Sequence, residues 1–375
     1  MQQIYYDGHE RPDVVKYREA WTRRMLDYAN RRETWGGEDM EIVIPPACLE
    51  PGMKKHVIVT HDECIFYSND AQQSMWLQEG ESVLKKKGNG GSIMVSEFLC
   101  ACHGRLRLSK EQAENLGIPD SAQKIIKPGK NKDGYWKSED MVAQLRDLAL
   151  PIFDALHPNC TGVFLFDQST NHNAYSEDAL LASRMTLNPK TEKKWRFKNG
   201  WYDFEGQRTV QPMFSEGQQF KGIRLILQER GLWRADWKLN CQEIPDPGQV
   251  THSCCGLHAL ASQPDFLEQK TAIAMEVEKR GHIFELYPKY HCECNFIERY
   301  WGSAKRMARQ QCDYSYKSLC VRVPVILDEV PLPHIKRFSE KAWRYINSYA
   351  SGLDAAGAER AQKQFKSHRR LRKDD

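Results

Sequence analysis

The amino-acid sequence predicts an α/β fold, a mixed five-stranded sheet flanked by helices, with a long insertion between the fourth and fifth strands. Five short apolar segments are typical of buried strands, and segments with the helical spacing of apolar residues separate the last three of them. Hydrophobic residues make up 41% and charged residues 28% of the 375 residues. This composition is typical of globular proteins and excludes a disordered, collagen-like or coiled-coil chain.

Charge, apolar runs and cysteine content narrow the class of protein. The formal net charge of +4 is too small to prove a polyanionic partner, so binding to nucleic acid would depend on local basic clusters. The first residues lack the apolar core of a signal peptide, and no later apolar run approaches the roughly 20 residues of a membrane helix. With 12 cysteines and no export signal, we expect an intracellular, reducing compartment and no membrane partner.

The first predicted element is a helix over residues 12–33. Pro12 suits the first turn, and apolar residues recur at three-to-four-residue spacing on one face. The other face is rich in arginine, which fits either phosphate contacts or an ordinary solvated face. A segment with proline and glycine follows, so we expect residues 1–52 to form a helical linker segment.

Three strands, a helix and a fourth strand are predicted next. The first strand is buried on both sides and ends at Asp62, and the second and third strands are joined by a short turn, as in an antiparallel meander. The compact apolar fourth strand ends directly before Asp167. In order, the predicted elements are strands at 57–62, 92–101 and 105–109, a helix at 140–156 and a strand at 161–166.

The middle of the chain loses this regularity. Residues 188–264 combine four tryptophans with glycine, proline and cysteine and show no clear period, so we interpret them as an insertion. Beyond them we expect a helix at 265–279, a fifth strand at 282–288 and a helix that begins near Asn295. The α/β domain then covers residues 53–350, interrupted by the insertion, and residues 351–375 form a basic C-terminal tail.

Three acidic residues stand out because of their places in this order. Asp62 and Asp167 follow the first and fourth strands, which are neighbours in such a sheet, and Glu298 lies in the first turn of the last helix. Convergent carboxylates are the ligands that Mg²⁺ or Mn²⁺ prefers, and two such ions about 4 Å apart can promote in-line displacement at a phosphodiester. Each acid taken alone is equally well explained as a helix cap, a surface charge or an ion-pair partner.

The sequences around these acids resemble a known family. The segments HDECIFYSND, FDQSTNH and YPKYHCECNFIERYWG are similar, in that order, to the three catalytic motifs of DDE transposases of the mariner type. The third motif is the most specific, and further similarity to a branch abundant in fungi extends over nearly the whole chain. The residues that match the third motif are Glu293, Asn295, Ile297, Glu298 and Trp301.

The resemblance implies a ribonuclease H-like fold and a catalytic domain that cleaves and transfers DNA strands with two Mg²⁺ or Mn²⁺ ions. Asp62, Asp167 and Glu298 would be the catalytic, metal-binding residues. Transposon-end and target DNA would be the partners, with a homodimer in the nucleus. The chain departs from the family at Gln168 and Cys294, and we expect it to lack the family's N-terminal helix-turn-helix region. The residues expected beside the site are Glu63, His172 and Asn295.

Two other functions remain open at this stage. A domesticated or inactive transposase relic would hold DNA or proteins without cutting, and a plain nuclease would hydrolyse DNA without joining it. The three intact acids favour the transposase, whereas the expected lack of the helix-turn-helix region favours the relic.

Basic residues that could contact DNA phosphates occur in three places. They lie beside a glycine-rich turn, on the last predicted helix and in the tail, where the cluster is also typical of a nuclear-import signal. Solvated surface charge is the alternative for each. The candidates are Lys85, Lys86, Lys87, Arg299, Arg306, Arg369 and Arg370.

Cysteine and histidine residues in and after the insertion could hold a structural zinc ion, since Zn²⁺ prefers thiolate and imidazole ligands. The spacing matches no standard zinc finger, and buried cysteine is often only a small apolar residue. The candidate ligands are Cys241, Cys254, Cys255 and Cys292, with His258 nearby in the sequence.

Overall fold

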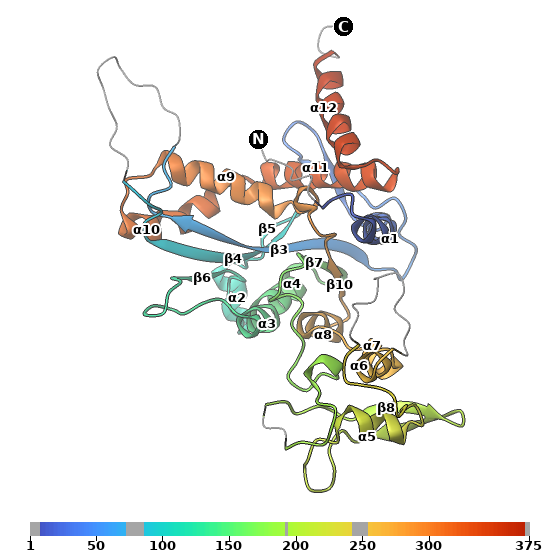
Figure 1. Ribbon diagram of the computed structural model, residues 1–375. Helices are drawn as coiled ribbons and strands as arrows, with labels where there is room; N and C mark the ends of the chain where they lie inside the picture. Colours follow the sequence, from blue (N-terminus) through green and yellow to red (C-terminus); the bar gives the residue numbers. More distant parts are fainter. Residues whose placement is uncertain (1–7, 73–85, 192–193, 242–253, 372–375) are drawn as a thin grey trace. The chain divides into compact units, whose positions relative to one another are not determined.

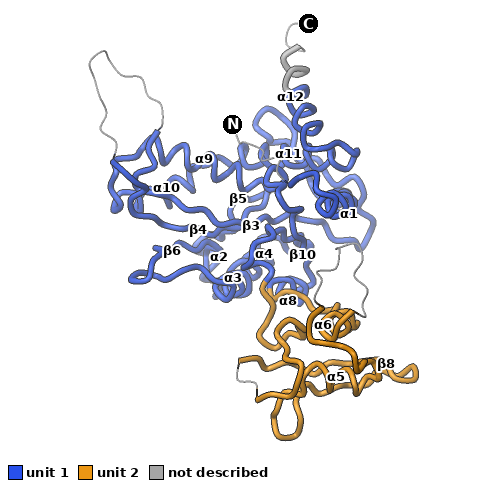
Figure 2. The backbone as a smooth tube through the Cα atoms, viewed as in Figure 1, with its two compact units in different colours: residues 1–173, 273–375 blue, residues 174–272 orange. Residues whose placement is uncertain are grey.

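The computed structural model describes residues 8–72, 86–191, 194–241 and 254–371, and of residues 366–371 only the backbone. The chain forms two compact units (Figure 2): Met1–Asn173 with Ile273–Asp375, and Ala174–Ala272. The predicted α/β class with a mixed sheet flanked by helices is confirmed. None of the helices that the structure describes is long and apolar enough to cross a membrane.

A mixed sheet is the centre of the first unit (Figure 1). Its strands are β3 (Lys55–Tyr67), β4 (Ser92–Cys100), β5 (Gly104–Arg105), β6 (Lys124–Ile126), β7 (Cys160–Phe166) and β10 (Ile283–Leu286), in the order β10-β7-β3-β4-β5, with β6 also paired to β4. β7 is parallel to both β3 and β10, whereas β4 is antiparallel to β3. The first and fourth predicted strands are therefore neighbours, as expected.

The sheet has six strands and not the five that the sequence predicts. The third strand ends at Arg105 and not at Ser109, because the chain beyond it pairs with residues 120–122: the Leu108 amide donates to the Asp120 carbonyl at 2.8 Å, and the Ala122 amide donates to the Leu106 carbonyl at 3.0 Å. Ser109 then caps the next helix, where its side chain accepts a hydrogen bond from the Gln112 amide. β6, which was not predicted, pairs with the stretch of β4 from Met94 to Ser96.

Helices cover both faces of the sheet. Because side chains alternate along a strand, the sheet contributes to two separate cores. One core includes residues of α1 (Pro12–Ala29), α9 (Ile297–Gln310), α10 (Tyr316–Glu329), α11 (Leu332–Ala350) and α12 (Ala355–Leu371). The other includes residues of α2 (Lys110–Leu116), α3 (Ser138–Gln144), α4 (Leu150–Leu156) and α8 (Ala272–Lys279).

Helix α1 is part of this unit and packs on its core. Trp21 is fully buried among core residues, although the sequence analysis places residues 1–52 in a separate linker segment. The arginine face is largely committed to ion pairs: Arg24 Nε lies 2.7 Å from Glu285, and Arg32 lies 2.8 Å from Glu340. A short hairpin of β1 (Thr34–Gly36) and β2 (Ile42–Ile44) follows α1.

Two predicted helices are interrupted. The helix at 140–156 contains a π turn, Leu145–Ala149, which ends two residues before Pro151, because proline cannot donate the next helical hydrogen bond and its ring displaces the preceding turn. The helix at 265–279 is divided into α7 (Pro264–Leu267) and α8. There the Gln269 side chain donates to the Asp265 carbonyl at 2.6 Å and so occupies an acceptor that a continuing helix would use.

The second unit has its own core and contains the predicted insertion, residues 188–264. Its elements are β8 (Gly200–Phe204), β9 (Gln207–Gln211), α5 (Gly222–Glu229), α6 (Gly256–Ala261) and α7. A buried ion pair connects them: Arg230 donates two hydrogen bonds to Asp265 at 2.9 and 2.7 Å, and both side chains are 1% exposed. Gln211 accepts a further bond from Arg230 at 2.8 Å.

Candidate active site

Asp62 and Asp167 lie on neighbouring strands. The prediction that the first strand ends at Asp62 is wrong: β3 continues to Tyr67, because its second half pairs with β4 alone. The parallel register of β3 and β7 joins Thr60 to Leu165. Two residues further along the same register, Asp62 comes next to Asp167, which directly follows the end of β7.

The first turn of α9 brings Glu298 to the same place. Asn295 precedes this helix and is 3% exposed, and its Oδ1 accepts hydrogen bonds from the Ile297 amide, at 3.4 Å, and from the Thr60 hydroxyl. Tyr287 in turn donates its hydroxyl to Thr60 at 3.1 Å. Because these bonds connect the helix N-terminus to β3, they fix Glu298 relative to that strand.

The three carboxylates line one cavity of about 740 Å³. Asp62, Asp167 and Glu298 are all half-buried, and Trp301 orients the first of them by donating from Nε1 to Asp62 Oδ2 at 3.2 Å. The sequence analysis therefore selects three acids that the structure places around a single cavity. The other lining residues are Gln168, Ser169, Tyr287, Pro288, Lys289, Tyr290, His291, Cys292 and Asn295.

Burial and mutual repulsion disfavour the ionised forms of two of these acids. Burial, followed by the nearby carboxylates of Glu298, Glu63 and Asp167, raises the pKa of Asp62 well above its usual value. Burial also raises the pKa of Glu298; Lys305 opposes this effect, and Asp167 adds to it. A bound cation would remove the repulsion, so the electrostatics of the cavity favour one.

A buried histidine has the opposite effect on Asp167. His172 is fully buried, with Nδ1 2.5 Å from Asp167 Oδ1 and Nε2 3.6 Å from Glu63 Oε1. Burial lowers the pKa of His172, but the hydrogen bond to Asp167 and the nearby Glu63 carboxylate outweigh burial and raise the pKa to about 10. Burial likewise opposes ionisation of Asp167, and the hydrogen bond from His172 outweighs it and lowers that pKa. His172 therefore supports the site from beside the cavity.

The donor set fits a hard divalent cation, since such ions take carboxylate oxygens and retain water. Among the residues that the structure describes, groups of donor atoms that all lie within 4.8 Å of one another include His61, Glu63 and His172 but not the three cavity carboxylates.

Comparison with known proteins gives structural similarity only. No family model matches the chain, and no curated protein matches it. The solved structures that are similar include a Mos1 transposase paired-end complex with left transposon end, at a TM-score of 0.47 and 10% identity over 94% of this chain and 66% of that chain. A Mos1 mariner paired end complex with Mn gives a TM-score of 0.44 at 10% identity, over 93% of this chain and 67% of that chain.

A third similar structure, the Mos1 strand transfer complex, gives a TM-score of 0.41 at 10% identity, over 94% of this chain and 65% of that chain. The chain thus spans about two thirds of the length of the transposase chains that it matches.

Lys305 and Tyr287 belong to the site but were not singled out from the sequence. Lys305 is close enough to Glu298 to lower its pKa and lies seven residues after it on α9, two helical turns along the same face. That spacing is the signal that could have identified the lysine. Tyr287 directly follows β10, and no sequence pattern distinguishes it from a core tyrosine.

The structure describes only some of the predicted DNA-contacting side chains of the glycine-rich turn and of the tail. Lys85 lies outside the described residues. Lys86 and Lys87 are exposed, and Lys86 Nζ donates to the Tyr314 carbonyl at 3.0 Å. Arg369 and Arg370 belong to α12, where the structure describes the backbone and not these side chains.

Arg299 and Arg306 line a second cavity, of about 370 Å³, together with Arg337. Arg299 is held in place, because it donates to the Glu293 carbonyl at 2.9 Å. Arg306 is exposed. Arg337 pairs with Asp39 at 3.4 Å, so the exposed Arg306 is the arginine of this cavity best suited to a phosphate contact.

The structure divides the four zinc candidates. Cys241, Cys254 and Cys255 surround His258, with their sulfur atoms 3.1–3.4 Å from His258 Nδ1. We call these four residues the Cys241 cluster; their ligand atoms all lie within 4.8 Å of one another. Cys292 is not a member, because it belongs to the other unit, where it lines the carboxylate cavity. Its role as a zinc ligand stays a prediction from the sequence.

Asn295→Ala should destabilise the protein by about 2 kcal/mol, because it removes the acceptor of the Ile297 amide and leaves the buried Thr60 hydroxyl without its acceptor. Urea unfolding measures the loss. The exposed Asn131 provides the control, since Asn131→Ala should change stability by less than about 0.5 kcal/mol. Equal effects of the two substitutions would mean that Asn295 does not hold α9.

Proposed function

We propose that this chain is the catalytic domain of a mariner-like DDE transposase with a ribonuclease H-like fold. It would cleave and transfer DNA strands with the help of divalent metal ions. The observation that carries the proposal is the convergence of Asp62, Asp167 and Glu298 around one cavity. The resemblance of the surrounding segments to the mariner catalytic motifs supports it.

Each residue of the site has a role in this chemistry. Asp62, Asp167 and Glu298 would hold Mg²⁺ or Mn²⁺, which activates a water or 3′-hydroxyl and stabilises the leaving oxygen. His172 keeps Asp167 ionised, and Trp301 orients Asp62. Asn295 acts as a positioning residue through its bonds to the start of α9 and to β3.

The test is incubation of the protein with a plasmid that carries the genomic flanks of its own reading frame, with Mg²⁺ or with EDTA. The proposal predicts strand cleavage with Mg²⁺ and none with EDTA, together with joined products. Cleavage without joining would indicate a nuclease. DNA binding without cleavage in either Mg²⁺ or Mn²⁺ would establish the alternative, a transposase relic that acts as a DNA- or protein-binding module.

Double-stranded DNA is the proposed partner, and Arg306 provides a quantitative prediction. Arg306→Ala should reduce the slope of log affinity against log salt by about 0.9, the value for loss of one phosphate contact on B-DNA. Fluorescence anisotropy at several salt concentrations measures this slope. Arg146→Ala is the control, because Arg146 is half exposed and pairs with Asp147. An unchanged slope in the Arg306 variant would exclude that contact.

We also propose a homodimer, since cutting and joining two transposon ends in one complex calls for two active sites. Sedimentation of the protein with DNA that carries an end sequence should give two chains per complex. One chain per complex under cleaving conditions would contradict this.

Nuclear localisation is proposed from the basic cluster at the C-terminus. Deleting residues 366–375 from a fluorescent fusion should lower its nuclear accumulation. The same deletion combined with an added import signal should restore it. Unchanged accumulation after the deletion alone would exclude the tail as an import signal.

The Cys241 cluster is proposed as a structural zinc site of the second unit, because three thiols and one imidazole within 4.8 Å of one another provide a closed set of soft ligands. Zinc analysis of a Cys241→Ser, Cys254→Ser variant tests this proposal. The variant should bind one ion fewer than the unaltered chain, and an equal content would contradict it.

A further inference from the structure

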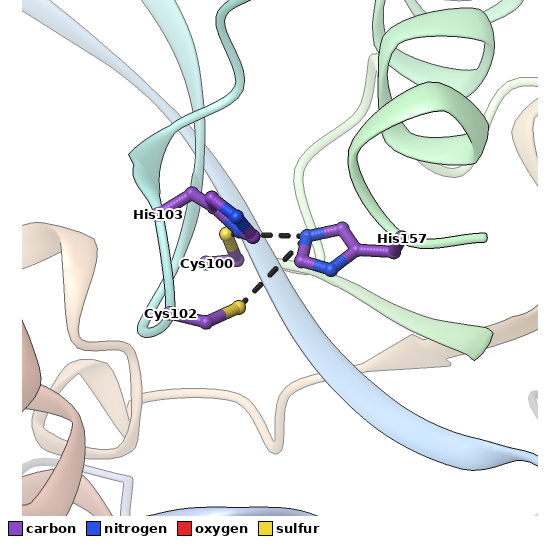
Figure 3. A group of neighbouring side chains, drawn as sticks. All are labelled: Cys100, Cys102, His103 and His157. Carbon is purple, nitrogen blue, oxygen red and sulfur yellow. Dashed lines mark hydrogen bonds between the residues drawn. The ribbon is translucent and has the colours of Figure 1, made fainter. Parts of the chain in front are cut away.

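A second cluster of cysteine and histidine lies in the first unit and includes none of the zinc ligands that the sequence suggested. We call Cys100, Cys102, His103 and His157 the Cys100 cluster (Figure 3). One ligand atom from each residue lies within 4.8 Å of all the others. Both thiols are free, and Cys100 and His157 are buried.

The backbone explains why three of these residues meet. Cys100 ends β4 and pairs with Gly104, so residues 101–103 form a three-residue hairpin turn. Gly104 has a φ of +76°, the left-handed conformation with which turns of this length commonly close. The tight turn therefore places Cys100, Cys102 and His103 close together on one hairpin.

The fourth residue comes from the other side. His157 follows the end of α4, and its amide donates to the Phe153 carbonyl at 2.9 Å. Its Nε2 faces both sulfur atoms, at 3.6 Å from Cys100 Sγ and 3.8 Å from Cys102 Sγ (Figure 3). The ring of His103 lies 4.7 Å from the ring of His157, between centroids.

These distances are those of a tetrahedral metal site. With Zn–S bonds of about 2.3 Å and Zn–N bonds of about 2.0–2.1 Å, a tetrahedral zinc ion separates sulfur from nitrogen by about 3.6 Å. The two observed sulfur–nitrogen distances agree with this value. Two thiolates and two imidazoles also form one of the usual ligand sets of structural zinc sites.

We propose that the Cys100 cluster binds one Zn²⁺ ion, which connects the β4–β5 turn to the C-terminal end of α4. The role is structural, because four protein ligands leave no position for water or substrate. The position of the cluster in the fold is consistent with a structural role. His157 lies just before β7 begins, whereas Asp167 lies just after β7 ends. The zinc ion and the carboxylate cavity are thus at opposite ends of that strand.

Zinc per chain, measured by elemental analysis of the full chain after removal of loosely bound metal, tests the proposal. A Cys100→Ser, Cys102→Ser variant should contain one zinc ion fewer than the unaltered chain. Cys320→Ser, which changes a half-buried free cysteine outside the cluster, should lose none. The Cys241→Ser, Cys254→Ser variant should retain the ion of the Cys100 cluster, so the two sites are counted separately. Equal zinc in the unaltered chain and the Cys100 variant would overturn the proposal.

A milder variant covers the case in which the double substitution prevents folding. His103 is exposed, so His103→Gln should leave the core intact while removing one ligand. It should weaken zinc binding at least tenfold in competition with a chromophoric chelator. Co²⁺ bound to the Cys241→Ser, Cys254→Ser variant should give the intense visible absorption of tetrahedral thiolate coordination. An intact mass that shows a Cys100–Cys102 disulfide and no metal would contradict the site.

Discussion

Replacing Glu298 by glutamine should abolish strand cleavage and yet make the metal-free protein more stable. Loss of one metal ligand removes several kcal/mol of transition-state stabilisation, so the rate with Mg²⁺ should fall at least about a thousandfold. Stability should change in the other direction. Burial and Asp167 raise the pKa of Glu298, which means that folding disfavours its ionised form at neutral pH. Glutamine removes that charge at nearly constant shape.

Asp167→Asn is the matched comparison. It should abolish cleavage as completely, but it should lower the stability of the metal-free protein, because the hydrogen bond from His172 favours the ionised form of Asp167. Thermal unfolding in EDTA measures both shifts. Glu139→Gln serves as the control, since Glu139 is exposed in the first turn of α3. Shifts of the same sign in the Glu298 and Asp167 variants would contradict this description of the cavity.

Asp265→Ala should destabilise the second unit by about 3–5 kcal/mol, the cost of leaving a buried charge without its partner. Arg230 is 1% exposed, and Asp265 accepts two of its hydrogen bonds. Asp265 also accepts a hydrogen bond from the Trp201 amide at 3.0 Å, so the substitution releases β8 as well. Denaturant unfolding followed by tryptophan fluorescence, together with hydrogen exchange of residues 174–272, measures the loss.

Two variants determine whether the buried charge is the cause. Asp236→Ala disrupts an ion pair with Arg234 in which both side chains are more than half exposed, so it should cost less than about 1 kcal/mol. A double variant with Arg230→Met and Asp265→Leu removes both charges and should recover most of the stability. If the double variant is as unstable as Asp265→Ala, the effect comes from packing and not from charge.

The order of the main strands and helices along the chain was predictable, because these elements are apolar segments that the sequence shows directly. β7 is a continuous apolar run ended by Asp167, and α9 shows its packing face in the spacing of Ile297, Tyr300, Trp301 and Ala304. The extent of β3 was not predictable. Its polar residues His61 and Glu63 read as the end of an apolar strand, whereas in the fold they continue the strand and meet His172.

Contacts between distant segments account for the other differences. His157 meets the β4–β5 turn only because α4 packs on one face of the sheet, so no local spacing in the sequence indicates the Cys100 cluster. The same holds for the Thr60–Asn295 bond, which joins two separate motifs. A distant contact also changes the interpretation of Arg24. Its place on an arginine-rich helix face fits a phosphate contact, but the side chain forms an ion pair with the buried Glu285, 261 residues away in the sequence.

The most direct test of the account is the position of Mn²⁺ in a crystal of this protein, located by anomalous scattering. We expect manganese in the cavity bounded by Asp62, Asp167 and Glu298, and loss of the signal in Glu298→Gln crystals grown under the same conditions. Manganese bound elsewhere, or an empty cavity at concentrations that support cleavage, would contradict the assignment of these carboxylates as the metal site.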